Sequence, residues 1–236
     1  MLKRVLLKLS GEQFAGQGKF GIDTNFITEL THELSDVVSA TKCQIVVVVG
    51  GGNFVRGAQL ASKEIERATA DYMGMLATIM NGVALVDILE FFGQPARLQT
   101  RLRIDSVAEP YIRRRAIRHL EKGRVVIVSG GTGNPYVSTD TAAVMTALEL
   151  DCEAVLKATK VDGVYDKDPH QHKDAVRLTN VTYLEALQND NIKVMDNSAI
   201  SLAMDHQLPI VVFDLLSKGN IKRIIEGERI GTWVAK

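Results

Sequence analysis

The sequence is poor in the residues that cross-link or interrupt a chain. Only two cysteines occur in 236 residues. Cys43 and Cys152 lack the spacing of a redox or metal pair, so we expect two reduced thiols. Five prolines and no low-complexity linker favour one continuous unit. No apolar run approaches the roughly 18 residues of a membrane span, and the apolar run after Met1 has no signal-peptide cleavage site. We therefore expect a cytoplasmic protein with no membrane partner.

The sequence also lacks an excess of either charge. Lysine plus arginine and aspartate plus glutamate each number 28, so the net charge is zero. General nucleic-acid binders are basic because they neutralise phosphates, and that class of function is disfavoured. One run is nonetheless basic, and its cations are Arg113, Arg114, Arg115, Arg118, Lys122 and Arg124. Three interpretations of this run are left open: a solvated helix face, a subunit contact or a site for an anionic effector.

Short β-branched runs alternate with longer helical patterns, which predicts an α/β fold. Continuously apolar strands are typical of a mostly parallel sheet with helices on both faces. The longest polar stretch, 160–181, predicts a functional loop or hairpin that divides a first lobe from a second. We expect strands at 5–9, 45–49, 96–99, 125–128, 154–157 and 210–213, and helices from residue 23 and over about 60–92, 109–121, 139–150, 182–190, 197–207 and 218–226.

The stretch "GGGNFVRG" at 50–57 follows a predicted strand. Its three glycines let the backbone take positive φ and let a ligand approach the amide groups, which suits phosphate. A Walker loop is excluded because Ala58-Gln59 stand where Lys-Ser/Thr is required, and a dinucleotide fingerprint is excluded because Val55 stands where glycine is required. The stretch therefore predicts an anion site of another design.

Four predicted strand ends carry glycine or small polar residues: "KLSGE" at 8–12, the glycine stretch, "SGGTGNPYVSTD" at 129–140 and "KATKVDGVYDKDP" at 157–169. Ligands of open α/β sheets bind beyond the carboxyl ends of strands, so these segments are expected around one crevice. Their amides, hydroxyls and two cations, Lys8 and Arg56, predict a polyanion site. Taken singly, Lys8 is also compatible with a snorkelling side chain and Arg56 with a solvated loop.

The acidic residues of these segments have two interpretations each. Asp140 is either a helix cap or the group that orients a lysine or a hydrated Mg²⁺. Asp71, among apolar residues, is either a buried acid that accepts from a ribose diol or an exposed acid. Asp196 is interpreted as a helix cap.

The polar loop offers weaker candidates. Tyr165 and Asp168 are either an ordinary turn or contacts for an adenine and its ribose. His170 and His172 have no further ligand nearby that would complete a metal site, so we interpret them as solvated.

Together these segments resemble the bacterial-type UMP kinases (uridylate kinases) of the amino acid kinase superfamily. The resemblance extends from about residue 3 to residue 233. "DYMGMLATIMNG" at 71–82 and "TGNP" before "STD" are narrow motifs that separate UMP enzymes from acetylglutamate, carbamate and aspartate kinases, whereas the glycine turns and Lys8 are shared more widely. "KVMDNSA" at 193–199 also matches.

The resemblance implies a three-layer αβα sandwich with a mostly parallel sheet, forming one domain over 1–236. A UMP-binding lobe would span about 1–150 and an ATP-binding lobe about 151–236. It implies transfer of the γ-phosphoryl of Mg-ATP to UMP, in pyrimidine nucleotide biosynthesis, with Mg²⁺ not held directly by the protein. The implied catalytic residues are Lys8, Arg56 and Asp140; the ATP-binding residues are Lys8, Leu9, Ser10, Gly11, Gly52, Arg56, Thr159, Tyr165 and Asp168; the UMP-binding residues are Gly51, Asp71, Thr132, Gly133, Asn134, Pro135, Tyr136, Val137, Ser138 and Thr139.

The resemblance also implies a homohexamer, activation by GTP and inhibition by UTP. The segment linked to GTP activation comprises Gly16, Gln17, Gly18, Lys19, Phe20 and Gly21. Two positions depart from the family pattern: Tyr136 is followed by Val137 and Ser138 where two aromatics are frequent, and Arg101 stands where a small residue is usual. The alternatives left open are a carboxylate or carbamate kinase of the same superfamily and a non-catalytic nucleotide sensor.

The chemistry is consistent with a phosphate acceptor. Phosphoryl transfer depends on in-line positioning and charge neutralisation. A phosphate with a second pKa near 6 is already mostly a dianion at neutral pH, so it needs no general base. We therefore expect Lys8 and Arg56 to neutralise the transferring group, the amides of Gly51 and Gly52 to bridge both nucleotides, and Asp140 to orient the cations.

Overall fold

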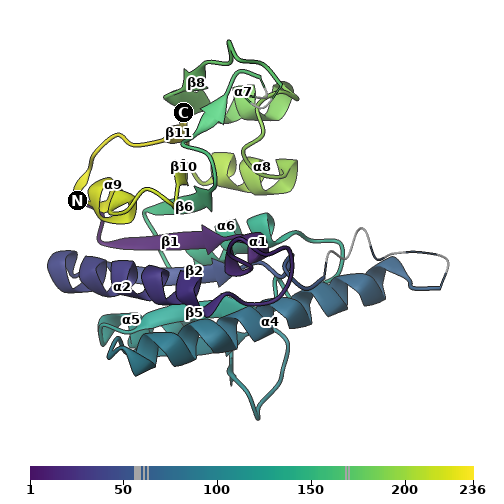
Figure 1. The fold of residues 1–236 in the computed structure, drawn as a ribbon, viewed down its shortest axis with the longest axis vertical. Helices are drawn as coiled ribbons and strands as arrows, with labels where there is room; N and C mark the ends of the chain where they lie inside the picture. Colours follow the sequence, from purple (N-terminus) through teal and green to yellow (C-terminus); the bar gives the residue numbers. More distant parts are fainter. Residues whose placement is uncertain (56–59, 61, 63, 168, 170) are drawn as a thin grey trace.

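The computed structural model describes residues 1–236 except 56–59, 61, 63, 168 and 170. One twisted sheet runs through the molecule (Figure 1). Its strands are β1 (Arg4–Leu9), β2 (Gln44–Val49), β3 (Ala96–Thr100), β4 (Glu109–Pro110), β5 (Val125–Ser129), β6 (Ala154–Thr159), β9 (Asn180–Thr182), β10 (Ile210–Asp214) and β11 (Thr232–Ala235). Within the described residues they are ordered β4-β3-β5-β2-β1-β6-β10-β11-β9, and every neighbouring pair is parallel except β10–β11.

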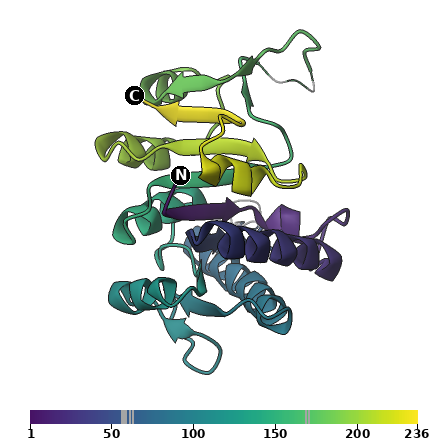
Figure 2. The same cartoon turned by 90° about the vertical axis from the view of Figure 1, so that its left-hand side faces the viewer.

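Helices cover both faces of this sheet (Figures 1 and 2). α2, α4 and α9 pack with the short α1 on one face, and α5, α6, α7 and α8 pack on the other. The three-layer sandwich with a mostly parallel sheet is thereby confirmed. The bounds are α1 (Gly11–Phe14), α2 (Thr24–Thr41), α4 (Arg67–Phe91), α5 (Arg113–Glu121), α6 (Thr139–Glu149), α7 (Tyr183–Gln188), α8 (Asn197–Asp205) and α9 (Asn220–Glu226).

The strands are apolar throughout because both faces are buried. In β1, Val5, Leu7 and Leu9 join the core under α2, α4 and α9, whereas Leu6 points into the core under α5 to α8. This alternation follows from the two-residue period of a strand. Each fully buried aliphatic side chain contributes roughly 1.5–3 kcal/mol, so the sheet is the most strongly stabilised layer and a rigid base for the loops at its ends.

The predicted helix after residue 23 is confirmed, and its signals are local. The Asp23 carboxylate accepts from the N–H of Asn25 at 2.9 Å, which caps the first turn of α2. Lys42 ends the helix in the left-handed region at φ 58°. Ile27 and Leu34 lie fully buried on the inner face, as the helical spacing predicts.

Several predicted boundaries were wrong. The helix expected over 60–92 is continuous only from Arg67, and the one expected over 109–121 starts at Arg113 because Glu109–Pro110 form the edge strand β4. The stretch 160–181 is confirmed as a hairpin, made of β7 (Val164–Tyr165) and β8 (Arg177–Leu178), and is followed by β9. α1 and the antiparallel β11 were not predicted.

α4 is long and apolar enough to cross a membrane by length and composition alone. Its 18-residue window has a mean hydropathy of 1.6, and 44% of that window is buried inside the protein. The expectation that no apolar run approaches the length of a membrane span was therefore wrong for α4. A count of consecutive apolar residues overlooks this helix because Asp71, Asn81 and Asp87 interrupt the run. In the fold α4 packs against α2, β3 and β5.

Candidate active site

The four glycine-rich segments meet at one edge of the sheet. Each follows one of four strands that adjoin in the order β5-β2-β1-β6, and these strands run parallel. Their carboxyl ends therefore lie side by side, which confirms the shared sheet edge of the prediction. Residues of the second and third segments line a common cavity.

The first two segments touch through bare backbone. A Cβ at Gly11 would lie 2.3 Å from the amide nitrogen of Gly52, and one at Gly50 would lie 2.8 Å from the nitrogen of Gly11. A Cβ at Gly51 would lie 2.6 Å from the carbonyl oxygen of Gly74 on α4. None of Gly50, Gly51 and Gly52 has a positive φ, so the expected left-handed backbone was wrong. Close packing is what requires glycine here.

Two lysines and one aspartate form an ion cluster at the base of the crevice. Lys8 Nζ lies 2.7 Å from Asp140 Oδ1, and Lys157 Nζ lies 3.0 Å from Asp140 Oδ2. The side chains of Lys8, Asp140 and Lys157 are 11%, 16% and 17% exposed. Ser138 caps α6 through its hydroxyl, so Asp140 is not the cap. Its ion pairs fit the interpretation that it orients a lysine, and it also lies in the first turn of α6, where a negative charge is favourable.

Burial and charge oppose each other in this cluster. Burial alone would raise the pKa of Asp140, but the charges of Lys8 and Lys157 outweigh it and hold the pKa below its ordinary value. Burial lowers the pKa of Lys157, and the charge of Asp140 opposes that effect. The formal charge of these three side chains, with both lysines protonated, is +1 in a poorly solvated place, which suits an anion. The carboxylate of Asp196 also acts on Lys157.

Lys157 was missed as a site residue in the sequence, although a signal existed. It is the register partner of Lys8 on the neighbouring parallel strand, so both side chains leave the sheet on the same face. Lysine at the end of two adjoining apolar strands is unusual enough to mark the pair. Lys157 also donates to the carbonyl of Val194, which fixes its ammonium group.

A cavity of about 590 Å³ adjoins the ion cluster and contains many of the predicted UMP residues. It lies between the glycine turn, the first turns of α4 and the start of α6. The predicted residues that line it are Gly51, Gly52, Asp71, Tyr136, Val137, Ser138 and Thr139. Thr132, Gly133, Asn134 and Pro135 belong to the same segment but do not line this cavity.

Asp71 is a partly buried acid with two partners. Its carboxylate forms an i,i+4 ion pair with Arg67 at 2.9 Å and accepts the N–H of Tyr136 at 2.9 Å. Tyr136 has φ 66°, an unusual value for a residue with a side chain. Arg67 also lies 5.8 Å from the centre of the Tyr136 ring. The structure thus adds Arg67, which we missed although its spacing from Asp71 was visible.

Most of the predicted ATP residues that the structure describes lie at the ends of β1 and β6, whereas Gly52 lies in the turn after β2 and lines the cavity described above. Leu9 ends β1, Ser10 is the N-cap of α1 and Gly11 begins it, with the Ser10 N–H donating to Gln13 at 2.8 Å. Thr159 ends β6 beside them. Tyr165 lies on the hairpin, and its hydroxyl donates to Asp162 at 2.7 Å. Two predicted residues, Arg56 and Asp168, lie outside the described residues.

Asp196 is confirmed as a helix cap, with a second task. It accepts the N–H of Ala199 at 3.0 Å, which caps α8. It also accepts the hydroxyls of Ser138 and of Thr141, the latter at 3.0 Å. One carboxylate therefore joins the first turns of α6 and α8, beside the predicted UMP segment.

The segment 16–21, linked by resemblance to GTP activation, contacts the glycine turn. Gly21 donates to the carbonyl of Asn53 at 3.2 Å and accepts from the Asn53 side chain at 2.7 Å. Phe20 is 74% exposed and packs edge-on against Phe54. The basic run of α5 is largely an ion-paired surface, in which Arg113 pairs with Asp151 and Arg118 with Glu121.

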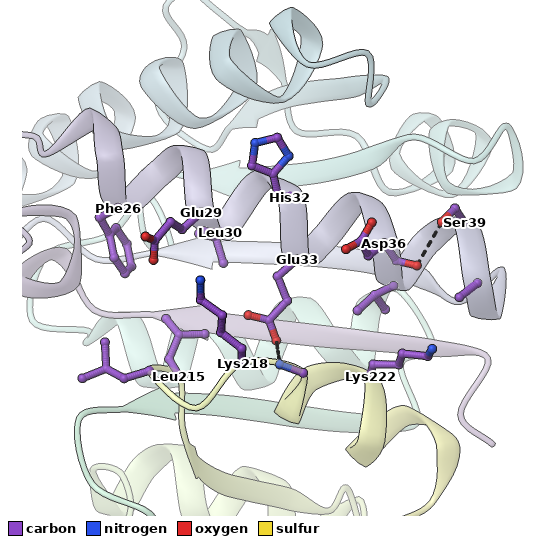
Figure 3. Close-up of a pocket in the computed structure, with 14 residues that line it drawn as sticks. Phe26, Glu29, Leu30, His32, Glu33, Asp36, Ser39, Leu215, Lys218 and Lys222 are labelled. Atoms are coloured by element: carbon purple, nitrogen blue, oxygen red, sulfur yellow. Dashed lines mark hydrogen bonds between the residues drawn. The ribbon is translucent and has the colours of Figure 1, made fainter.

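A second cavity, of about 610 Å³, lies away from the crevice loops, between α2 and α9 (Figure 3). Glu33 points into it and accepts the N–H of Gly219 at 3.2 Å. Burial raises the pKa of Glu33 despite that bond and the nearby charge of Lys218. No sequence motif pointed to this groove.

Comparisons with known proteins agree on one family. Residues 3–214 match the amino acid kinase family model. A UMP kinase from Bacillus anthracis has 37% identity and a TM-score of 0.94, covering 99% of this chain and 96% of that one. A UMP kinase from Ureaplasma parvum has 30% identity and a TM-score of 0.91, covering 100% of both chains. An aspartate kinase from Synechocystis, with 20% identity and a TM-score of 0.71 over 98% of this chain and 39% of its own, shares the fold alone.

Proposed function

The chain belongs to the amino acid kinase family, and we propose that it transfers the γ-phosphoryl group of ATP to UMP, giving ADP and UDP. One observation carries this proposal: the cavity bounded by Gly51, Asp71 and Tyr136 adjoins the positively charged cluster around Asp140. Two structural neighbours with at least 30% identity are UMP kinases that this chain covers over essentially their whole length.

Catalysis follows from positioning and charge. The UMP phosphate is a nucleophile without a general base, because it is already mostly ionised at neutral pH. Lys8 and Lys157 neutralise charge on the transferring phosphoryl, and Asp140 holds both ammonium groups in place between turnovers. Arg56 would add a further cation beside the glycine turn. Electrostatic preorganisation of this kind needs no reorganisation at the moment of transfer.

In this proposal Mg²⁺ reaches the site with the nucleotide. Within the described residues no three His, Cys, Asp or Glu side chains gather into a metal-binding group, and the carboxylate of Asp140 already binds two lysines. Mg²⁺ would be held by ATP phosphate oxygens and water, and it supplies charge neutralisation of the phosphates. The residues of this chain bind and orient those phosphates.

The two nucleotides approach from opposite sides of the glycine turn. UMP occupies the cavity beside α4 and α6, with its ribose hydroxyls donating to Asp71, which keeps acceptor capacity beyond its bonds to Arg67 and Tyr136. Residues 136–139, which line the cavity, enclose the base. ATP lies over Ser10 and Gly11, with its adenosine toward Thr159 and the hairpin that carries Tyr165. In this proposal UMP binds to the lobe of about 1–150, and ATP binds to the lobe of about 151–236 together with the Ser10–Gly11 turn.

We propose that the subunits pair through α4 and assemble into a homohexamer. Met73, Leu76, Met80 and Val83 are 36–50% exposed along its outer side. Their 3-4-3 spacing matches a coiled-coil seam, and Tyr72 adds to a contiguous apolar surface of the kind that marks interfaces. Two copies packed along this seam would bury it.

Regulation by GTP as activator and UTP as inhibitor is part of the same proposal, as are a cytoplasmic location and a role in pyrimidine nucleotide biosynthesis. Support comes from the bonds between Gly21 and Asn53, which connect the segment 16–21 to the glycine turn. An effector that orders this segment would bias the turn where both nucleotides meet.

The test is ADP release from Mg-ATP, comparing UMP, CMP, dTMP and AMP with acetylglutamate, aspartate and carbamate. Strong turnover with UMP is the expected result. Turnover with a carboxylate or carbamate but with no nucleotide would overturn the assignment of the Asp71 cavity. Nucleotide binding without turnover on any acceptor would instead indicate a sensor.

A further inference from the structure

The acceptor turn, residues 130–133, rests on the turn that follows β3. A Cβ at Gly130 would lie 2.9 Å from the hydroxyl of Thr100, and one at Gly133 would lie 3.4 Å from both Cβ and the carbonyl oxygen of Arg101. Both glycines have positive φ, 83° and 79°. The two turns are therefore in direct contact, and a displacement of Arg101 displaces the floor of the acceptor segment.

The side chain of Arg101 extends from that floor to the far end of α6. Its Nη2 lies 2.6 Å from Glu149 Oε2 and donates to the hydroxyl of Thr146 at 3.1 Å. α6 begins at Thr139, directly after the acceptor segment, and ends at Glu149. Arg101 thus contacts the start of the acceptor segment through its backbone. Its guanidinium contacts α6, the helix that follows this segment.

The guanidinium is held from several sides. It stacks over the Tyr111 ring at 4.2 Å from the centroid, and the Tyr111 hydroxyl donates to the same Glu149 oxygen at 2.6 Å. The Arg101 side chain is 13% exposed, so solvent screens the ion pair less than it screens a surface pair. A small side chain, which is usual at this position in the family that the sequence resembles, could make none of these contacts.

From this geometry we infer that Arg101 is a positioning residue for the acceptor nucleotide, fixing the spacing between the turn 130–133 and the C-terminal end of α6. The inference rests on the proposed function of the cavity. Arg101 reaches α6 at Thr146 and Glu149 rather than at Asp140, and its contacts with the acceptor segment lie at Gly130 and Gly133. Its effect therefore falls on UMP affinity and not on ATP affinity or on transfer.

The experiment compares four variants in steady-state kinetics with UMP and ATP varied separately. In Arg101→Ala the KM for UMP is expected to rise about two- to thirtyfold, the range that corresponds to a network coupling of roughly 0.5–2 kcal/mol, while kcat and the KM for ATP stay within about twofold. Glu149→Gln should also raise the KM for UMP. Arg101→Lys should recover part of the affinity for UMP, because lysine keeps the positive charge but lacks the planar guanidinium group that binds two partners at once. The control is Arg97→Ala, which removes a more exposed ion pair between Glu90 of α4 and Arg97 of β3, the strand that precedes Arg101.

The outcomes separate this inference from the function it rests on. If the wild type and Arg97→Ala phosphorylate UMP while Arg101→Ala and Glu149→Gln keep the wild-type KM for UMP, the positioning role is wrong and the proposed function stands. If the KM for ATP rises as much as the KM for UMP, the substitution has a general structural effect, and this result too would overturn the positioning role. If Arg101→Ala does not fold, the same comparison of the KM for UMP with the KM for ATP is made in Arg101→Lys and Glu149→Gln. A wild type that neither phosphorylates UMP nor gains melting temperature from it overturns both.

Discussion

Replacing Asp140 by asparagine tests the ion cluster most directly. The substitution keeps the shape of the side chain but removes the charge that lies 2.7 Å from Lys8 and 3.0 Å from Lys157. Each contact has a Coulomb energy of roughly 5–6 kcal/mol at an effective dielectric constant of about 20, before the cost of desolvation. Breaking a buried pair by removing one partner typically costs about 3–5 kcal/mol, because the remaining charge is left unpaired.

For a chain of this length, 1 kcal/mol corresponds to a melting-temperature change of about 2–4 °C. Asp140→Asn should therefore melt about 6–20 °C below the wild type near neutral pH. Turnover should fall about 10²–10³-fold because the lysines lose their orientation at the transferring group. Differential scanning calorimetry and ADP release measure the two effects. Asp151→Asn is the control, because Asp151 forms an exposed ion pair with Arg113 and such pairs contribute about 0–1 kcal/mol.

The pH dependence makes this prediction specific. In the wild type the pKa of Asp140 is lowered, so its stabilisation is present above the ordinary value of 3.8 and is lost as the pH falls through the folded value. In Asp140→Asn the pKa of Lys157, already lowered by burial, falls further. The deficit should then shrink as the pH rises from neutral, because a neutral Lys157 no longer needs a counter-charge. A variant as stable as the wild type at neutral pH, with turnover within about fivefold, would refute the reasoning.

Three further substitutions test other parts of the molecule. Asn81→Leu removes a fully buried amide that makes reciprocal side-chain hydrogen bonds with Asn53, of 2.7 and 2.9 Å. It should lower the free energy of unfolding in urea by about 1–3 kcal/mol. Thr31→Val, which removes a buried hydroxyl that has no partner among the described residues, should leave that free energy unchanged, and equal effects of the two substitutions would contradict the reasoning. Glu33→Gln should raise the melting temperature at neutral pH, since burial raises the pKa of Glu33 and its ionised form is disfavoured, and the gain should vanish below the ordinary value of 4.5; a lower melting temperature at neutral pH would disprove this. Met80→Glu should reduce the assembly size in light scattering, whereas Leu184→Glu, equally exposed but on α7, should not; an unchanged assembly would exclude α4 as the interface.

Much of the architecture could be predicted because the strands are buried on both faces. Runs such as Ile45–Val49 are apolar at every position, which only a sheet covered on both sides permits. The position of the crevice followed from the same reading, since parallel strands place their carboxyl ends together. The ends of the elements were less predictable, because α4 and α5 begin where the tertiary fold permits and not at a strong capping residue.

Site residues next to a glycine turn were predictable from the sequence, whereas residues brought together by the pairing of strands were less so. Lys8 could be selected because the Ser10-Gly11 turn follows it closely. A lysine near the end of the apolar strand β6 was a visible signal for Lys157, but its pairing with Lys8 required the register of β1 against β6. The positive φ expected for the triple glycine was wrong because two glycine functions, conformational freedom and close approach, have the same sequence signature.

The floor of the crevice has a consequence for inhibitors and for resistance to them. At Gly11, Gly50 and Gly51 the atom nearest to a new Cβ belongs to the backbone of Gly52, Gly11 and Gly74 respectively, and backbone atoms cannot rotate aside as a side chain can. Single-base changes in the gene would therefore produce misfolded or inactive chains at these positions. A compound that takes its affinity from those amides would bind a surface that mutation cannot reshape, whereas one that depends on exposed side chains such as Tyr136 would not have this protection.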